Sequence, residues 1–181
     1  LIGRFNVENG LAAIAASSHA GVSIPTAAAA LATFKPVKRR LEVKFAAHGI
    51  TVYDDFAHHP TAIGRTVDAL KRSGKHQRIL VLLEFASNTM RSGVHVANMP
   101  QALAKVDHAF FLKPDQFDLE KIAQDWQFSY EILSHCSMIV KRVAEEVKPG
   151  DAVVIMSNRG FGNIQQAIVT ALSCQHTSPQ L

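Results

Sequence analysis

Residues 78–83, Arg-Ile-Leu-Val-Leu-Leu, place five apolar side chains in a row, and this run constrains the fold more than any other feature of the chain. A strand with one face in water alternates apolar and polar residues, so an unbroken run predicts a strand that is buried on both faces. Such strands occur in parallel sheets that helices cover on both sides. The rest of the chain must therefore supply further strands and the helices that cover them.

The remaining pattern meets this requirement, because segments of strand and helix character alternate along the chain. In order, we predict strands at 41–45 and 50–53, a helix at 60–73, the strand at 78–83, a helix at 99–105, a strand at 108–112, a helix at 119–125, a strand at 128–132, a helix at 138–147, a strand at 152–156 and a helix at 164–172. The predicted fold class is α/β, a Rossmann-like and mostly parallel sheet with helices on both faces.

The first 36 residues have a different character. They contain two Ala-rich stretches with helical spacing, Asn6 to His19 and Ser23 to Phe34, which are too short to enclose a core of their own. We predict that residues 1–36 are the helical tail of a preceding domain, that 37–173 form the α/β domain and that 174–181 are a disordered tail. Without an initiator methionine or a signal-peptide layout, the start resembles the middle of a longer polypeptide.

Composition narrows the function classes. The chain has 181 residues and a net charge of +4, and its apolar stretches fall well short of the ~20 residues that a membrane helix needs. Its two cysteines, Cys136 and Cys174, lack metal-ligand spacing and are typical of reduced thiols in a cytoplasmic protein. Lys and Arg are scattered, so we expect phosphorylated or carboxylate-rich small molecules as partners, and neither nucleic acid nor a membrane. The oligomeric state is not predicted.

The loop at 54–60, Asp-Asp-Phe-Ala-His-His-Pro, follows a predicted strand and precedes a helix. Ligands of parallel sheets bind at this end of the strands. The carboxylate of Asp55 and the imidazoles of His58 and His59 can hold a cation or orient a phosphate and a ribose. The simpler alternative is a helix-capping aspartate beside two solvent-facing histidines.

A second polar loop, 84–93, follows the most apolar strand and contains Ser87, Asn88, Thr89 and Arg91. Their hydroxyl, amide and guanidinium donors suit recognition of a carboxylate or a zwitterion. An ordinary connecting loop would have the same composition.

The third loop, 157–163, contains Ser157, Asn158, Arg159 and Phe161 between a strand and a helix. Its two glycines allow close backbone approach, and the helix start favours an anion. As a phosphate-binding motif it is weak, and no Gly-x-x-x-x-Gly-Lys-Ser/Thr occurs anywhere in the chain.

A fourth segment lies at the start of the chain, where Asn6 and Asn9 stand one helical turn apart. Their amides can pair with the edge of a base. Capping of the first helix by Asn6 is the simpler alternative.

In this order, the segments resemble the Mur ligase family of ATP-dependent amide ligases. Residues 3–10 are similar to the Gly-x-His-Asn-x-x-Asn segment that ends the family's central ATPase domain. Residues 40–42, Arg-Leu-Glu, are similar to the Arg-x-Glu that starts its C-terminal domain. Residues 54–60 are similar to the Asp-Asp-Tyr-Ala-His-His-Pro of the branch that handles muramate. The resemblance covers nearly the whole chain.

The resemblance implies a role for each matched position. Asn6 and Asn9 are expected to contact adenine, Arg40 to reach the nucleotide phosphates and Asp55 to lie near the ribose. ATP and Mg²⁺ are the implied cofactors, bound mainly by the central domain, and an acyl phosphate is the implied intermediate. Since the Walker motif belongs to that domain, we expect this chain alone to be inactive.

Two loops indicate which branch of the family the chain resembles. Residues 87–90 and 157–162 resemble the Ser-Asn-Thr-Met and Ser-Asn-Gly-Gly-Phe-Gly of the branch that joins UDP-N-acetylmuramate to L-alanyl-γ-D-glutamyl-meso-diaminopimelate in peptidoglycan recycling. These two compounds, the second a murein tripeptide, are the implied small-molecule substrates, in the bacterial cytoplasm. His58, His59 and the polar residues of the two loops are then substrate contacts. The alternatives are an L-alanine-adding or polyglutamate-adding ligase of the same family, and a non-enzymatic α/β binding module.

Three positions depart from the family pattern. Phe5 replaces a histidine, Phe85-Ala86 replaces Pro-Arg, and Arg159 replaces a glycine. The missing arginine at position 86 leads to the hypothesis that Arg91 or Arg159 supplies a displaced guanidinium.

Overall fold

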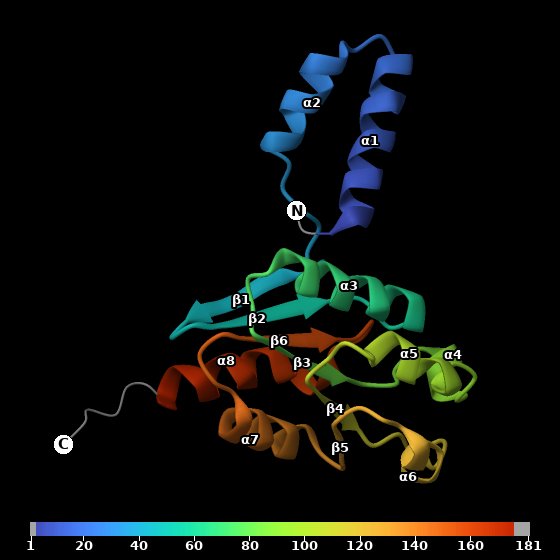
Figure 1. The fold of residues 1–181 in the computed structure, drawn as a ribbon, viewed down its shortest axis with the longest axis vertical. Helices are drawn as coiled ribbons and strands as arrows, with labels where there is room; N and C mark the ends of the chain where they lie inside the picture. Colours follow the sequence, from blue (N-terminus) through green and yellow to red (C-terminus); the bar gives the residue numbers. More distant parts are fainter. Residues whose placement is uncertain (1–2, 176–181) are drawn as a thin grey trace, which may run out of the picture.

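The computed structural model describes residues 3–175, which form one mixed sheet between two helical layers and a helical hairpin that projects from it (Figure 1). The helices are α1 (Arg4–His19), α2 (Ile24–Ala32), α3 (Pro60–Ser73), α4 (Asn88–Arg91), α5 (Met99–Leu103), α6 (Leu119–Ile122), α7 (Cys136–Glu146) and α8 (Ile164–Gln175), with 3₁₀ turns at Val96–Asn98, Ala123–Asp125 and Phe161–Asn163. The strands are β1 (Glu42–Ala47), β2 (Ile50–Asp55), β3 (Arg78–Leu83), β4 (His108–Leu112), β5 (Tyr130–Leu133) and β6 (Asp151–Met156).

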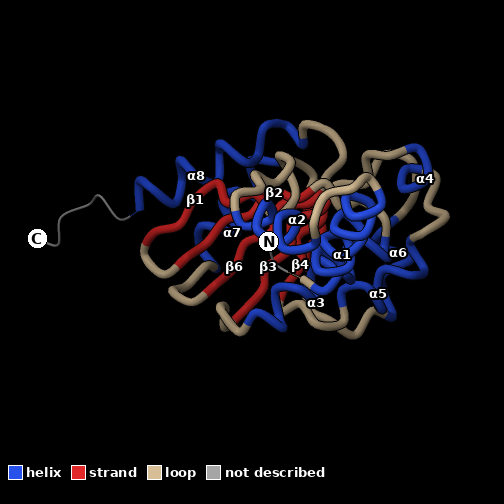
Figure 2. The backbone as a smooth tube through the Cα atoms, turned by 90° about the horizontal axis from the view of Figure 1, so that it is seen from above, coloured by secondary structure: helices blue, strands red, loops and turns tan. Residues whose placement is uncertain are grey.

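The six strands are ordered β1-β2-β6-β3-β4-β5. Only β1 runs antiparallel to its neighbour, and the other four pairs are parallel. The last strand in the chain, β6, thus lies between β2 and β3 in the middle of the sheet. Figure 2, seen from above, shows α7 and α8 on one side of the strands and α3 and α5 on the other. The predicted α/β fold class is confirmed.

The core consists of two apolar layers, one on each face of the sheet. In β3, Ile79 and Val81 pack in the layer that contains α3 and α5, while Leu80 and Leu82 pack in the layer with α7 and α8. Successive side chains of a strand point to opposite faces, so a strand between two helical layers needs apolar residues throughout. The unbroken run at 78–83 has this cause.

Most predicted helices and strands occur within a few residues of their predicted bounds, and the helix at 60–73 and the strands at 78–83 and 108–112 match theirs. The treatment of residues 84–93 as a loop was wrong, because they contain α4. The hydroxyl of Ser87 accepts a hydrogen bond from the N–H of Met90 at 3.2 Å and caps this single turn.

The hairpin of α1 and α2 buries little, since Ala27 is its one buried residue among those described. Apolar side chains such as Val7 and Leu11 are exposed on it. At the other end of the chain, α8 continues through Gln175, and the rest of the predicted tail, 176–181, lies outside the described residues. Within 3–175, no helix is both long enough and apolar enough to span a membrane.

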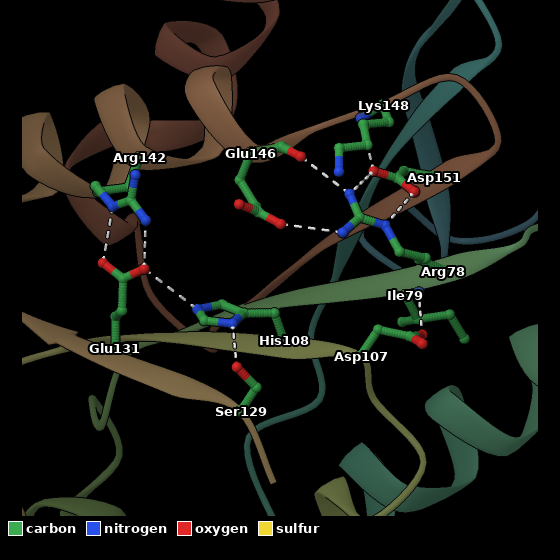
Figure 3. Close-up of polar contacts among 10 residues, drawn as sticks. All are labelled: Arg78, Ile79, Asp107, His108, Ser129, Glu131, Arg142, Glu146, Lys148 and Asp151. Carbon is green, nitrogen blue, oxygen red and sulfur yellow. Dashed lines mark hydrogen bonds and ion pairs between the residues drawn. The ribbon is translucent and has the colours of Figure 1, made fainter.

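A network of ion pairs ties the amino ends of the strands to α7 (Figure 3). The guanidinium of Arg78, at the start of β3, donates to both carboxylate oxygens of Asp151, at 2.9 and 2.7 Å, and to Glu146. Arg142 of α7 makes a two-pronged contact with Glu131 of β5. Ion pairs therefore hold α7 against this end of the sheet, which is opposite the end where the polar loops lie.

Candidate functional site

The carboxyl ends of β2, β6 and β3 lie side by side, so the three polar loops that follow these strands meet. Ser157 joins them. Its N–H donates to the carbonyl of Asp55 at 3.2 Å, and its hydroxyl, fully buried, donates to the carboxylate of Glu84. The same hydroxyl accepts the N–H of Arg159 at 2.8 Å. The structure thus brings together the segments that the sequence singled out at 54–60, 84–93 and 157–163.

Asp55 lies beneath this surface, with 4% of the residue exposed. Its Oδ2 accepts the N–H of Leu41 at 2.8 Å, and its Oδ1 accepts the N–H of Ala57 at 2.8 Å and the hydroxyl of Thr66 at 3.4 Å. Burial raises the pKa of Asp55, while the backbone donors and the charge of Arg40 oppose that rise. Both carboxylate oxygens therefore accept hydrogen bonds from the protein itself.

The linker before β1 forms a tight turn in which Arg39 (φ 58°) and Leu41 (φ 48°) both have left-handed backbone conformations. The N–H of Arg39 donates to Glu42 at 2.9 Å, and its guanidinium donates to the carbonyl of Ser157 at 2.5 Å. Hydrogen bonds from Lys44 and from this backbone N–H lower the pKa of Glu42. The turn is thereby joined to the loop after β6.

Arg40 stands between these two residues and is exposed. Its guanidinium lies 5.5 Å from the centre of the Phe56 ring, and that of Arg39 lies at the same distance. Among residues 3–175, no carboxylate forms an ion pair with Arg40. A guanidinium held against an aromatic face without a paired anion is suited to bind phosphate or carboxylate.

The two histidines predicted as substrate contacts lie at the start of α3. His58 is half-buried, with Nδ1 at 2.9 Å from the carbonyl of Phe56. His59 is exposed and caps α3, because its Nδ1 accepts the N–H of Thr61 at 3.3 Å, and its ring contacts His95. The alternative that an aspartate caps this helix was wrong.

The polar residues of α4 divide into two groups. Asn88 and Thr89 are exposed and can face a ligand, whereas the hydroxyl of Ser87 is engaged in capping. Arg91 is half-buried at the end of the turn. Ala86, where the family pattern has arginine, is buried.

The loop after β6 also contains exposed and buried members. The Oδ1 of Asn158 is buried without a hydrogen-bond partner, and the ring of Phe161 packs in the core, so any substrate contact of Phe161 would involve its backbone. Arg159 is exposed, and together with Arg39 and Lys44 it lines a groove of about 370 Å³ beside α8.

Asn6 and Asn9 lie on α1, in the hairpin that stands apart from the sheet in Figure 1. The alternative that Asn6 caps this helix was wrong, since α1 begins at Arg4 with Gly3 in the cap position and no side chain caps it. Contact of the two amides with adenine stays a prediction.

Sequence reasoning missed Arg39, Thr66 and Gln165. Arg39 lies 3.3 Å from Asp54 in an ion pair, and Gln165 of α8 donates to the same carboxylate at 3.3 Å. Only the position of Arg39 next to Arg40 offered a signal. In the part of the chain that the structure describes, no group of three or more His, Cys, Asp or Glu side chains is placed to hold a metal ion.

Comparisons with known proteins agree with this architecture. The family described as Mur ligase, glutamate ligase domain, matches residues 39–159. The ligases named UDP-N-acetylmuramate–L-alanyl-γ-D-glutamyl-meso-2,6-diaminoheptandioate ligase from Escherichia coli and Haemophilus influenzae are 41% and 42% identical over 96% and 95% of this chain. The chain spans 38% and 39% of their lengths.

Solved structures show the same relationship. A murein peptide ligase from Psychrobacter arcticus is 39% identical, with a TM-score of 0.72 over 99% of this chain and 38% of its own. A single domain of a related ligase from Haemophilus ducreyi is 38% identical, with a TM-score of 0.62 over 74% of this chain and 99% of its own. The L-alanine ligase of Thermotoga maritima, 19% identical, shares the fold with a TM-score of 0.80.

Proposed function

Because the chain belongs to the Mur ligase family, we propose that it is part of an ATP-dependent ligase that joins UDP-N-acetylmuramate to L-alanyl-γ-D-glutamyl-meso-diaminopimelate in peptidoglycan recycling. One observation carries this proposal. Two ligases named for this reaction match almost the whole chain at more than 40% identity. Since the chain spans less than two fifths of either, the activity belongs to the longer enzyme.

In the proposed reaction, ATP phosphorylates the muramate carboxylate. The tripeptide amine then displaces phosphate from the acyl phosphate, which leaves the amide, ADP and inorganic phosphate. Phosphoryl transfer of this kind relies on positioning and on neutralisation of charge. The contribution of this chain is to orient the reactants, with Arg40 directed at the nucleotide phosphates and the loops at 84–93 and 157–163 directed at the tripeptide.

The residues present fit ATP better than they fit Mg²⁺. Among the residues that the structure describes, no carboxylate pairs with the guanidinium of Arg40, which leaves it available to a phosphate. Asp54 and Asp55, the carboxylates nearest to it, are occupied by Arg39 and by backbone donors. We therefore assign the metal ion and the Walker motif to a central domain, of which residues 1–36 are the tail, and expect no catalysis from this chain alone. The location that follows from this reaction is the bacterial cytoplasm.

The loops at 84–93 and 157–163 depart from the family pattern, and these departures concern the choice of substrate. Of the two candidates for the displaced guanidinium, Arg159 is exposed and lies two residues after Ser157, whereas Arg91 is half-buried. We propose Arg159 as the carboxylate contact. The other proposed neighbours of the tripeptide are unchanged: Ser87, Asn88, Thr89, Asn158, His58 and His59.

The experiment that tests the proposal is an NMR titration of the ¹⁵N-labelled chain with the tripeptide, with L-alanine as a second acceptor. Shift changes at 87–91 and 157–163 with tripeptide alone are expected. Equal changes with L-alanine would favour the L-alanine-adding ligase. No change with either at millimolar concentration would contradict acceptor binding by this chain alone.

A further inference from the structure

We propose that His58 takes a proton from the incoming amine during amide formation, and that its neighbour His59 is held in the opposite tautomer and does not serve as a base. This inference rests on the proposed function for the identity of the amine and of the acyl phosphate that the amine attacks. The assignment of the two tautomers rests on hydrogen bonds within the chain.

The first argument is the tautomer of His58. Its Nδ1 lies 2.9 Å from the carbonyl oxygen of Phe56. A carbonyl oxygen can only accept, so Nδ1 of the neutral ring must carry the proton and Nε2 must carry the lone pair. Within residues 3–175, no other group forms a hydrogen bond with this Nε2. The lone pair of His58 is therefore available to a ligand.

His59 has the reverse arrangement. Its Nδ1 accepts the N–H of Thr61 at 3.3 Å, the hydrogen bond that caps α3. A ring nitrogen that accepts a backbone N–H carries no proton, so in the neutral ring the proton must be on Nε2. While it caps the helix, His59 can donate a proton to a ligand but has no second lone pair with which to take one. Backbone groups thus fix two adjacent histidines in opposite tautomers.

The second argument is the position of the two rings in the site. The ring of His58 meets that of Phe56 edge-on, with the ring centres 5.4 Å apart, and the guanidinium of Arg40 lies 5.5 Å from the centre of the same Phe56 ring. The ring of His59 contacts that of His95, shortly after the polar loop that follows β3, with the centres 4.4 Å apart. The pair of histidines therefore connects the residue proposed to bind phosphate with the segment proposed to bind the tripeptide.

The proposed step begins with the acceptor as an ammonium group, which has no lone pair with which to attack. One proton passes to Nε2 of His58, and the freed lone pair attacks the carbonyl carbon of the acyl phosphate. The C–N bond forms, and the C–O bond to phosphate breaks with its electron pair on phosphate. The second proton lost by the nitrogen goes to the departing phosphate, and His58 returns its proton to water. Imidazole is the side chain that most often transfers protons in this way.

The first measurement is the tautomer of each ring in this chain, from long-range ¹H–¹⁵N NMR correlations of the neutral rings. The variants His58→Asn and His59→Asn assign the signals, because each removes one set. We expect the proton of His58 on Nδ1 and that of His59 on Nε2. A proton on Nε2 of His58 would overturn the inference, whatever the chain binds.

The second measurement uses the longer ligase that contains this chain, and compares two nucleophiles. Hydroxylamine is largely unprotonated near neutral pH and traps an acyl phosphate as a hydroxamate without help from a base, whereas the amine of the tripeptide must first lose a proton. In His58→Asn, the side-chain amide can still donate to the carbonyl of Phe56, but no Nε2 remains. The kcat for amide formation should therefore fall about a hundredfold, while hydroxamate formation is retained.

His59→Asn is the matched control, because asparagine is a good helix cap and the variant removes a donor but no base. Any loss in this variant should lower amide and hydroxamate formation in the same proportion. Equal loss of both products in His58→Asn would overturn the inference, since His58 would then act before the amine attacks. Failure of the proposed function has a different result: the wild-type ligase would form neither product from UDP-N-acetylmuramate, even with the two tautomers as assigned.

Discussion

Arg78→Ala should destabilise the fold by about 3 kcal/mol, because it leaves the buried carboxylate of Asp151 without its ion-pair partner. The guanidinium of Arg78 makes two hydrogen bonds to Asp151 and two to Glu146, and the side chain of Asp151 is 2% exposed. Removal of one partner of a buried pair costs about 3–5 kcal/mol, and the lower end applies because the Arg78 side chain is 28% exposed. The N–H of Lys148 remains as a donor to Asp151.

The assay is urea unfolding followed by circular dichroism, with Arg142→Ala as the matched control. Arg142 also makes a two-pronged contact, but its side chain is 37% exposed, so its loss should cost clearly less than the loss of Arg78. The corresponding fall in Tm for Arg78→Ala is about 6–12 °C. The double variant Arg78→Ala/Asp151→Ala should lose less than the sum of the single losses, because no unpaired charge stays buried. Equal costs for Arg78→Ala and Arg142→Ala would refute the reasoning.

Three further predictions concern other parts of the molecule. Burial lowers the pKa of both His76 and His108 below the usual value of about 6.5, so the stability that the neutral rings contribute is present above that pH and is lost as the pH falls. The Tm should therefore decline when it is measured from pH 8 down to pH 5, and a flat profile would contradict this. Burial raises the pKa of the Cys136 thiol, so iodoacetamide at pH 7.5 should label Cys136 more slowly than the exposed Cys174, as mass spectrometry of the peptides will show. Gly162→Ala should cost about 1–2 kcal/mol in thermal unfolding, because φ is 56° and the new Cβ would lie 3.0 Å from Sγ of Cys136; if Cys136→Ala restored all of the loss, backbone strain would play no part.

The sequence contained enough to predict the fold, because the unbroken run at 78–83 and the alternation after it leave few arrangements open. It also located the three loops, since polar residues after buried strands are visible in the chain itself. It did not reveal the hydrogen bond from Arg39 to Ser157, whose partners are 118 positions apart and whose acceptor is a backbone carbonyl. Backbone acceptors carry no residue-type signature, so the turn around Arg40 and the hydrogen bonds of Asp55 became visible only in the structure.

The position of β6 has a consequence for how the protein is made. Residues 50–55 and 78–83 leave the ribosome before the strand that separates them, which arrives only with residues 151–156. Until then, two apolar strands have open edges toward each other and toward other nascent chains, and pairing across a long stretch of sequence is slow. Translation that stalls before Asp151 would therefore release an aggregation-prone intermediate, and synthesis of residues 151–156 supplies the strand that closes the sheet.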